Sequence, residues 1–182
     1  MTGGPEHAER GSGLRIGVAI PVPDPIGPEL ERWRASFGDP QAGSVPAHIT
    51  LLPPTGVDEA DLPAIEEHLA QAASLVPAFD IQLRGTGTFR PVSPVVFAAL
   101  AAGIAGCEAL ERRVRSGVLD RDVEFPYHPH VTVAHDLPDD VLDEAYEVLA
   151  DLRAGWRCEQ FALYVHDALD GRWNVRAEYR LA

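Results

Sequence analysis

Residues 46–51 (PAHITL) and 129–133 (PHVTV) each contain a histidine, an aliphatic residue, a threonine and a second aliphatic residue in succession. This alternation of polar and aliphatic residues is typical of a half-buried β-strand, because successive side chains of a strand point to opposite faces. We therefore predict that His48 and Thr50 share the exposed face of one strand, and that His130 and Thr132 share that of another. Two imidazoles, each accompanied by a hydroxyl, indicate a paired acid–base site.

The two motifs stand at the same place in two successive halves of the chain. His48 and His130 are 82 residues apart, and so are Phe79 and Phe161. We predict a duplicated strand-helix-strand-helix-strand unit with pseudo-repeats at about 14–90 and 94–182. Pseudo-twofold symmetry would set the two motif strands beside each other across a cleft.

Apolar periodicity and turn residues predict where the elements lie. The predicted helices cover about 26–37, 58–75, 104–118 and 138–152, and the predicted strands cover 14–21, 48–52, 79–83, 94–100, 130–134, 158–165 and 172–181. Pro53 and Pro54 should end the first motif strand, because proline cannot donate to a strand ladder. Asp170-Gly171 should form the turn of the last hairpin.

Length and composition indicate one compact domain. A chain of 182 residues, 46% of them hydrophobic, can bury a sizeable core, and we assign residues 14–182 to a single bilobal unit. Residues 1–13 contain four glycines and no apolar run, so we expect a disordered tail and no signal peptide. No segment reaches the roughly 18 apolar residues of a membrane span. We expect a cytoplasmic monomer.

Charge restricts the partners that the chain can bind. The formal net charge is −13, and every basic residue is an arginine. Such a surface repels long polyanions unless a local arginine patch overrides it, whereas a small phosphorylated molecule suffers less repulsion. Cys107 and Cys158 lack the spacing of a disulfide framework or a zinc site, and we interpret both as packing residues.

With these motifs, the chain resembles the 2H phosphoesterase superfamily, and within it the 2′-5′ RNA ligase and cyclic phosphodiesterase group. The resemblance covers about residues 14–182 and includes the stretch 85–89 (GTGTF) between the halves. It departs at His135, where several ligase-type relatives carry an arginine.

The resemblance implies a bilobal α+β fold with two antiparallel sheets lining a V-shaped cleft and helices outside. It also implies chemistry without a metal or other cofactor on 2′,3′-cyclic phosphates or 2′-5′-linked ribonucleotide ends. The partner would be a small nucleotide or an RNA end that bears a cyclic phosphate. His48 and His130 would be the catalytic pair, and Thr50 and Thr132 would bind the phosphate oxygens.

The residue types suit this chemistry independently of the resemblance. Opening a cyclic phosphodiester requires one group that accepts a proton from water and another that gives a proton to the departing ribose oxygen. Because imidazole has an ordinary pKa near 6.5, a pair can hold one neutral and one charged member near neutral pH. Threonine hydroxyls can bind the non-bridging oxygens. Either histidine could be the base.

Several alternatives stay open. Tyr127, Phe89 and Arg90 flank the expected cleft and could contact the substrate, or they could be strand packing and an exposed guanidinium. His128, His130 and His135 could form a metallohydrolase site, although strict alternation gives His135 the opposite parity and no carboxylate recurs at ligand spacing. A nucleotide-binding or RNA-end-binding module without turnover and a 2′-5′ RNA ligase are the remaining functional alternatives.

Overall fold

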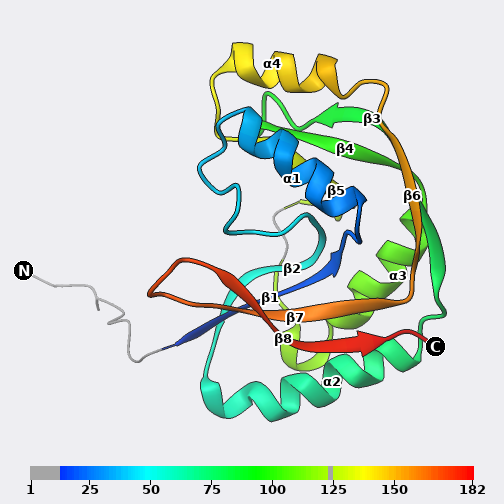
Figure 1. Ribbon diagram of the computed structural model, residues 1–182. Helices are drawn as coiled ribbons and strands as arrows, with labels where there is room; N and C mark the ends of the chain where they lie inside the picture. Colours follow the sequence, from blue (N-terminus) through cyan, green and yellow to red (C-terminus); the bar gives the residue numbers. More distant parts are fainter. Residues whose placement is uncertain (1–12, 123–124) are drawn as a thin grey trace, which may run out of the picture.

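The computed structural model describes residues 13–122 and 125–182, so the predicted tail lies outside the described residues except for Gly13. Over this part of the chain, eight strands form a curled antiparallel sheet and four α-helices pack against it (Figure 1). The predicted α+β class is confirmed. Among the same residues, no helix has the length and apolar character that crossing a membrane requires.

The elements follow the predicted order with shifted boundaries. The strands are β1 (Leu14–Pro21), β2 (His48–Val57), β3 (Phe79–Thr88), β4 (Val95–Ala102), β5 (His130–His135), β6 (Arg153–Cys158), β7 (Gln160–His166) and β8 (Trp173–Arg180). The α-helices are α1 (Ile26–Ser36), α2 (Leu62–Ser74), α3 (Ile104–Val114) and α4 (Asp139–Val148), with 3₁₀ turns at Glu59–Asp61 and Gly117–Leu119.

The strands form one sheet in the order β6-β3-β4-β5-β2-β1-β7-β8. The expectation of two separate sheets is therefore not confirmed. However, the two four-stranded halves meet only between β5 and β2, where Ile49 and Val131 are the one pair of Cα partners in the ladder of the described residues.

Strands related by the 82-residue offset occupy equivalent places on either side of this join. β2 and β5 meet at the join, β1 and β4 come next, and β7 and β3 follow. β7 pairs with β1 and β3 pairs with β4, so each half of the sheet takes its third strand from the other half of the chain. The 82-residue offset thus relates three strands on one side of the join to three on the other.

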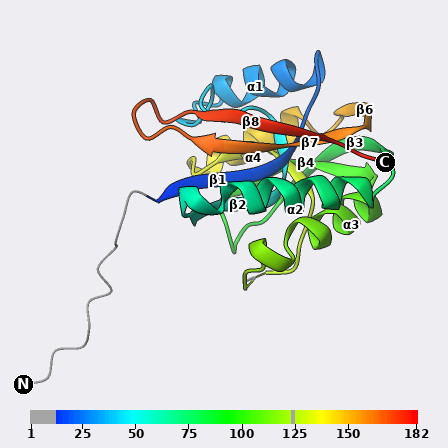
Figure 2. The same ribbon diagram turned by 90° about the horizontal axis from the view of Figure 1, so that it is seen from below.

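The helices divide in the same manner. α2 and α3 pack together on the half that contains β2 and β8, whereas α1 and α4 contact the half that contains β5. Figures 1 and 2 show α1 and the α2–α3 pair on opposite sides of the strands. A single large apolar cluster draws buried residues from both halves, including Ile16, Leu69, Val131 and Leu142. The apolar core therefore runs across both halves of the sheet.

Two strand predictions were wrong for reasons of pairing. β2 continues through Pro53 and Pro54 to Val57. The prolines are tolerated because they lie in a bulge where β2 has one residue more than β1. On its other side, β2 has no ladder partner at this point among the described residues. The sequence prediction omitted β6. It is an edge strand that pairs only with β3 among the described residues, and its exposed arginines and Gly155 weaken its pattern.

Two helix predictions were too long. α4 ends at Val148 instead of about residue 152. α3 ends at Val114 instead of continuing to about residue 118. A separate 3₁₀ turn follows, and Gly117 adopts a left-handed backbone with φ of 57° that an α-helix does not accommodate.

The junction between the halves should contribute to the free energy of unfolding. Ile49 is 0% exposed, and its replacement by alanine leaves a cavity at the one ladder pair that joins the two halves within residues 13–122 and 125–182. We expect Ile49→Ala to lower the free energy of unfolding by about 2–5 kcal/mol, measured by urea denaturation followed by circular dichroism.

The matched control is Val175→Ala on β8, where the side chain is 55% exposed. This variant should stay within about 0.5 kcal/mol of the parent protein. An Ile49→Ala variant as stable as Val175→Ala would show that the junction does not hold the halves together.

Candidate active site

The pairing of β2 with β5 brings the two motifs onto one face of the sheet. Ile49 and Val131 are Cα partners, and both side chains are fully buried in the core. Their neighbours along each strand therefore point to the opposite face, where they are half-buried. Antiparallel register sets His48 opposite Thr132 and Thr50 opposite His130. Each imidazole thus has one threonine hydroxyl on its own strand and another on the neighbouring strand.

Both imidazoles are held by a backbone carbonyl two residues upstream. His48 Nδ1 donates to the Pro46 carbonyl at 2.6 Å, and His130 Nδ1 donates to the His128 carbonyl at 2.7 Å. A carbonyl can only accept, so each neutral ring carries its proton on Nδ1. Nε2 of each ring is then left as a base, or as an acid when the ring is protonated. The sequence analysis did not identify these orienting carbonyls.

The surroundings lower the pKa of both histidines. Burial is the main cause for His48, and the charge of Arg34 adds to it, while the hydrogen bond to the Pro46 carbonyl opposes the change. Burial also dominates for His130; the hydrogen bond to the His128 carbonyl again opposes it, and the charges of His128 and His48 lower the pKa further. The two motif imidazoles are therefore close enough that protonation of one disfavours protonation of the other.

A cavity of about 230 Å³ lies against this face of the sheet. Strands β1, β2, β5, β7 and β8, helix α1 and the loop before β2 contribute to its walls. Its lining residues are Gly17, Val18, Ala19, Arg34, Gln41, Val45, Pro46, His48, Thr50, Leu52, Pro54, Thr132, His135, Tyr164 and Trp173. His130 lies on the same face of β5 but is not among the described residues that line the cavity.

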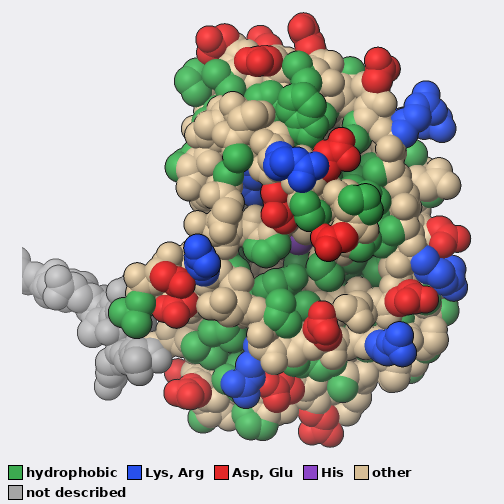
Figure 3. Space-filling view, viewed as in Figure 1, with side chains coloured by type: hydrophobic (Ala, Val, Ile, Leu, Met, Phe, Trp, Pro, Cys, Tyr) green, Lys and Arg blue, Asp and Glu red, His purple; other side chains and the backbone are tan. Residues whose placement is uncertain are grey.

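The cavity contrasts in charge with the rest of the protein. Its lining includes Arg34, His48 and His135, and none of the described residues that line it is an aspartate or glutamate. The whole chain carries 28 acidic residues. Figure 3 shows a histidine side chain recessed near the centre of one face, with acidic side chains spread over the outer surface. The cavity is therefore suited to an anion.

Two of its polar residues reach the site in ways that the sequence does not reveal. Arg34, on α1, is one of 15 arginines in the chain, and nothing in its local sequence distinguishes it. His135 was expected on the other face, but β5 has one residue more than β4 between Thr132 and Ala134. This bulge reverses the alternation and turns His135 to the cavity, so the predicted parity was wrong.

An aromatic cluster surrounds His130. The ring centroid of Phe89 lies 4.9 Å from that of His130, with the planes at 89°, and Phe97 lies 5.2 Å away. Phe89 and Phe97 also pack against each other at 4.5 Å. Phe89, predicted as a candidate substrate contact, thus packs against the second motif histidine and limits the orientations of its ring.

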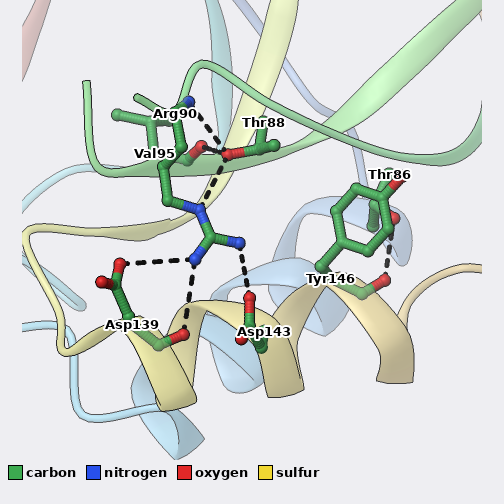
Figure 4. A network of polar contacts seen from close by, with 7 residues as sticks. All are labelled: Thr86, Thr88, Arg90, Val95, Asp139, Asp143 and Tyr146. Carbon is green, nitrogen blue, oxygen red and sulfur yellow. Dashed lines mark hydrogen bonds and ion pairs between the residues drawn. The ribbon is translucent and has the colours of Figure 1, made fainter. Parts of the chain in front are cut away.

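Arg90 and Tyr127, the other candidate contacts, are engaged within the protein. Arg90 donates to Asp143 at 2.7 Å and to Asp139 at 3.4 Å on α4, so its guanidinium points to this helix (Figure 4). Tyr127 Oη donates to the Thr50 carbonyl at 3.0 Å and ties the segment before β5 to β2. Arg90 therefore belongs to an ion-pair network with α4, which neither reading of the sequence included.

The residues of the metallohydrolase alternative are separated. The rings of His128 and His130 are 6.5 Å apart between centroids, and His135 pairs with Asp136 at 3.3 Å. Within the described residues, no three side chains of histidine, cysteine, aspartate or glutamate form a group that could hold a metal ion.

Comparisons with known proteins agree on one family. A model described as the 2′-5′ RNA ligase superfamily matches residues 22–170. The chain is 28% identical over 149 residues to "Putative phosphoesterase OB1230" of Oceanobacillus iheyensis, covering 81% of this chain and 85% of that protein.

Solved structures share the fold. Escherichia coli LigT complexed with 3′-AMP superposes with a TM-score of 0.70 and 22% identity, covering 94% of this chain and 99% of that one. LigT complexed with NADP⁺ superposes with a TM-score of 0.70 and 23% identity over the same shares.

The lowered pKa values predict how acid affects stability. A histidine whose pKa is lower in the folded state contributes its full stability above pH 6.5 and loses it as the pH falls through the folded pKa, because the unfolded chain binds the proton first. We expect the double variant His48→Gln/His130→Gln to lose less stability than the parent between pH 6.5 and more acidic pH, measured by urea denaturation. Equally steep losses would show that neither pKa is lowered.

Proposed function

Because this chain belongs to the 2′-5′ RNA ligase superfamily, we propose that it is a metal-independent phosphodiesterase of 2′,3′-cyclic phosphate or 2′-5′-linked ribonucleotide ends. His48 and His130 serve as its acid–base pair. The observation that carries the proposal is the Ile49–Val131 pairing, which sets two equally oriented imidazoles on one face of the sheet. The resemblance seen in the sequence is thereby confirmed at the level of the family.

Hydrolysis needs two proton transfers. Nε2 of the neutral imidazole accepts a proton from water as the water oxygen bonds to phosphorus, and Nε2 of the protonated imidazole donates to the ribose oxygen as its bond to phosphorus breaks. The product is a ribose phosphomonoester with one free hydroxyl. The two rings have then exchanged protonation states, so either could act as base. The same pair could join two ends if a ribose hydroxyl of a second end attacked the cyclic phosphate in place of water.

The threonines complete the phosphate site. Thr50 and Thr132 lie diagonally across β2 and β5, as do the two histidines. A phosphate centred over these four residues has imidazoles on one diagonal and hydroxyl donors for its non-bridging oxygens on the other. The lack of carboxylates among the described lining residues supports binding of this anion.

The related structures support a small nucleotide as the substrate. LigT has been solved with 3′-AMP, NADP⁺ and ATP, and it shares this fold over nearly the whole chain. A non-catalytic binding module is less consistent with the site, because binding alone does not require two imidazoles that both leave Nε2 available.

Removal of either imidazole should abolish most of the activity. We expect His48→Ala and His130→Ala each to lower kcat for adenosine 2′,3′-cyclic phosphate by roughly 10²- to 10⁴-fold, because each loses one proton transfer. Release of 2′-AMP or 3′-AMP, separated by chromatography, is the measurement.

His68→Gln is the control, since His68 bonds to the Val114 carbonyl between α2 and α3, and this carbonyl is not part of the cavity. It should keep parental activity. Parental turnover by either motif variant, with folding verified by circular dichroism, would contradict the mechanism.

The pH dependence should report the lowered pKa values. With both values below 6.5 in the free protein, kcat/KM should follow a bell-shaped profile with its maximum below pH 6.5. Bound phosphate favours protonation, so the maximum of kcat should lie at higher pH. The profile should be unchanged by EDTA. A kcat/KM that rises steadily to alkaline pH would argue against paired imidazoles.

A further inference from the structure

Arg34 is the buried cation of the cavity. Arg34 lies in the last turn of α1 and is only 6% exposed, but it is one of the residues that line the cavity. Burial of a guanidinium is costly unless its charge is compensated and its N–H groups find acceptors. The compensation comes from Asp39, which is 5% exposed and accepts from Arg34 Nε at 2.7 Å.

This pairing uses only one edge of the guanidinium. The second oxygen of Asp39 accepts from the backbone N–H of Gln41 at 2.8 Å, so the carboxylate is fully engaged. Among the described residues, no hydrogen-bond partner is found for the Arg34 Nη atoms. If these atoms were fully buried, they would be buried polar atoms without a partner, but the one such side-chain atom among the described residues is Tyr179 Oη. The Nη atoms are therefore accessible, and they reach the cavity that Arg34 lines.

Arg34 stands beyond one end of the four-residue motif site. His48 lies opposite Thr132, and past this end come Pro46 on the β2 side and His135 on the β5 side, both in the cavity wall. The charge of Arg34 acts on the His48 imidazole, so the two groups are neighbours. The motif histidines and threonines already provide partners for the reacting phosphate. Arg34 supplies a separate, fixed donor pair next to it.

We infer that this end of the cavity is a second anion-binding subsite, in which the Arg34 fork binds a second phosphate group of the same nucleotide. The inference rests on the proposed function, and it narrows the substrate to ribonucleotide ends that carry a 5′-phosphate as well as the reacting phosphodiester. The ligand chemistry is a phosphate monoester or diester on the 5′ side of the ribose.

Guanidinium chemistry favours phosphate at this position. Two parallel N–H groups match two phosphate oxygens, and the charge-assisted bonds are stronger than neutral ones. No lining carboxylate among the described residues competes for the fork, because Asp39 bonds to Nε and the exposed Asp136 bonds to His135. Asp39 also accepts a hydrogen bond from the backbone of Gln41, which lines the cavity. Asp39 therefore holds in place both Arg34 and the loop that forms this part of the cavity wall.

Calorimetric titration of the full chain tests the subsite without relying on turnover. We expect adenosine 3′,5′-bisphosphate to bind at least about tenfold more tightly than 3′-AMP, in line with one charge-assisted contact. Arg34→Lys keeps the charge but removes the fork and should abolish most of this preference, while affinity for 3′-AMP stays within about twofold. The double variant Arg34→Gln/Asp39→Asn, which leaves no unpaired buried charge, should do the same if Arg34→Lys does not fold.

Arg115→Lys is the matched control. Arg115 pairs with Glu111 at 3.4 Å, its side chain is 13% exposed, and it lies outside the cavity lining. It should keep the parental preference. Rates of hydrolysis are then compared for 5′-phosphoadenosine 2′,3′-cyclic phosphate and for a diadenosine that ends in a 2′,3′-cyclic phosphate. The faster substrate shows whether the preferred second phosphate is a 5′-monoester or an internucleotide diester.

Two results would overturn the subsite. The first is equal affinity of the parent for both nucleotides, and the second is an equal loss of affinity for both nucleotides in Arg34→Lys. The proposed function fails separately: a retained tenfold preference without hydrolysis of any cyclic phosphate would refute the phosphodiesterase and support the subsite. Hydrolysis without the preference would do the reverse.

Discussion

The contact between Ile49 and Val131 is the constraint on which the rest of the molecule depends. It is the one ladder pair between the two halves of the sheet in the described residues, and both side chains belong to the continuous core. A slip of one residue in either strand would turn its histidine and threonine to the buried face. The same apolar packing that joins the halves therefore fixes the register of the motif residues.

Electrostatics set the site apart from its surroundings. A chain with a net charge of −13 surrounds a cavity lined by Arg34, two histidines and no carboxylate among the described residues. Backbone carbonyls orient the motif imidazoles, so no acidic side chain is needed beside them. Burial lowers the pKa of both imidazoles and so favours their neutral forms, whereas bound phosphate would offset the energetic cost of protonating one of them.

Local pattern predicted much of the fold and the centre of the site. Alternation located the two motif strands, and the repeated spacing indicated that they would meet, because both signals lie within short stretches of the chain. The errors in the strands arose where pairing between distant strands decides the structure. The bulge that turns His135 to the cavity depends on the register of β5 with β4, and β2 passes Pro53 and Pro54 because of its register with β1.

The position of Arg34 in the cavity also could not be predicted from local sequence pattern. Its role depends on the loop that returns Asp39 to α1 and on the packing of α1 beside β5, neither of which has a local signature. Phe89 lies in the stretch that carried the family resemblance, yet its contact with His130 follows from the fold of the β3–β4 connection. Pattern identifies chemically capable residues, and long-range packing decides which of them meet.

In the proposed mechanism, both motif imidazoles contact one phosphate. A crystal structure of the protein with bound 3′-AMP is the decisive test. We expect phosphate oxygens within hydrogen-bond reach, about 2.6–3.2 Å, of Nε2 of both His48 and His130. A phosphate that contacts only one of the two imidazoles, or that binds outside the cavity, would contradict the paired acid–base site.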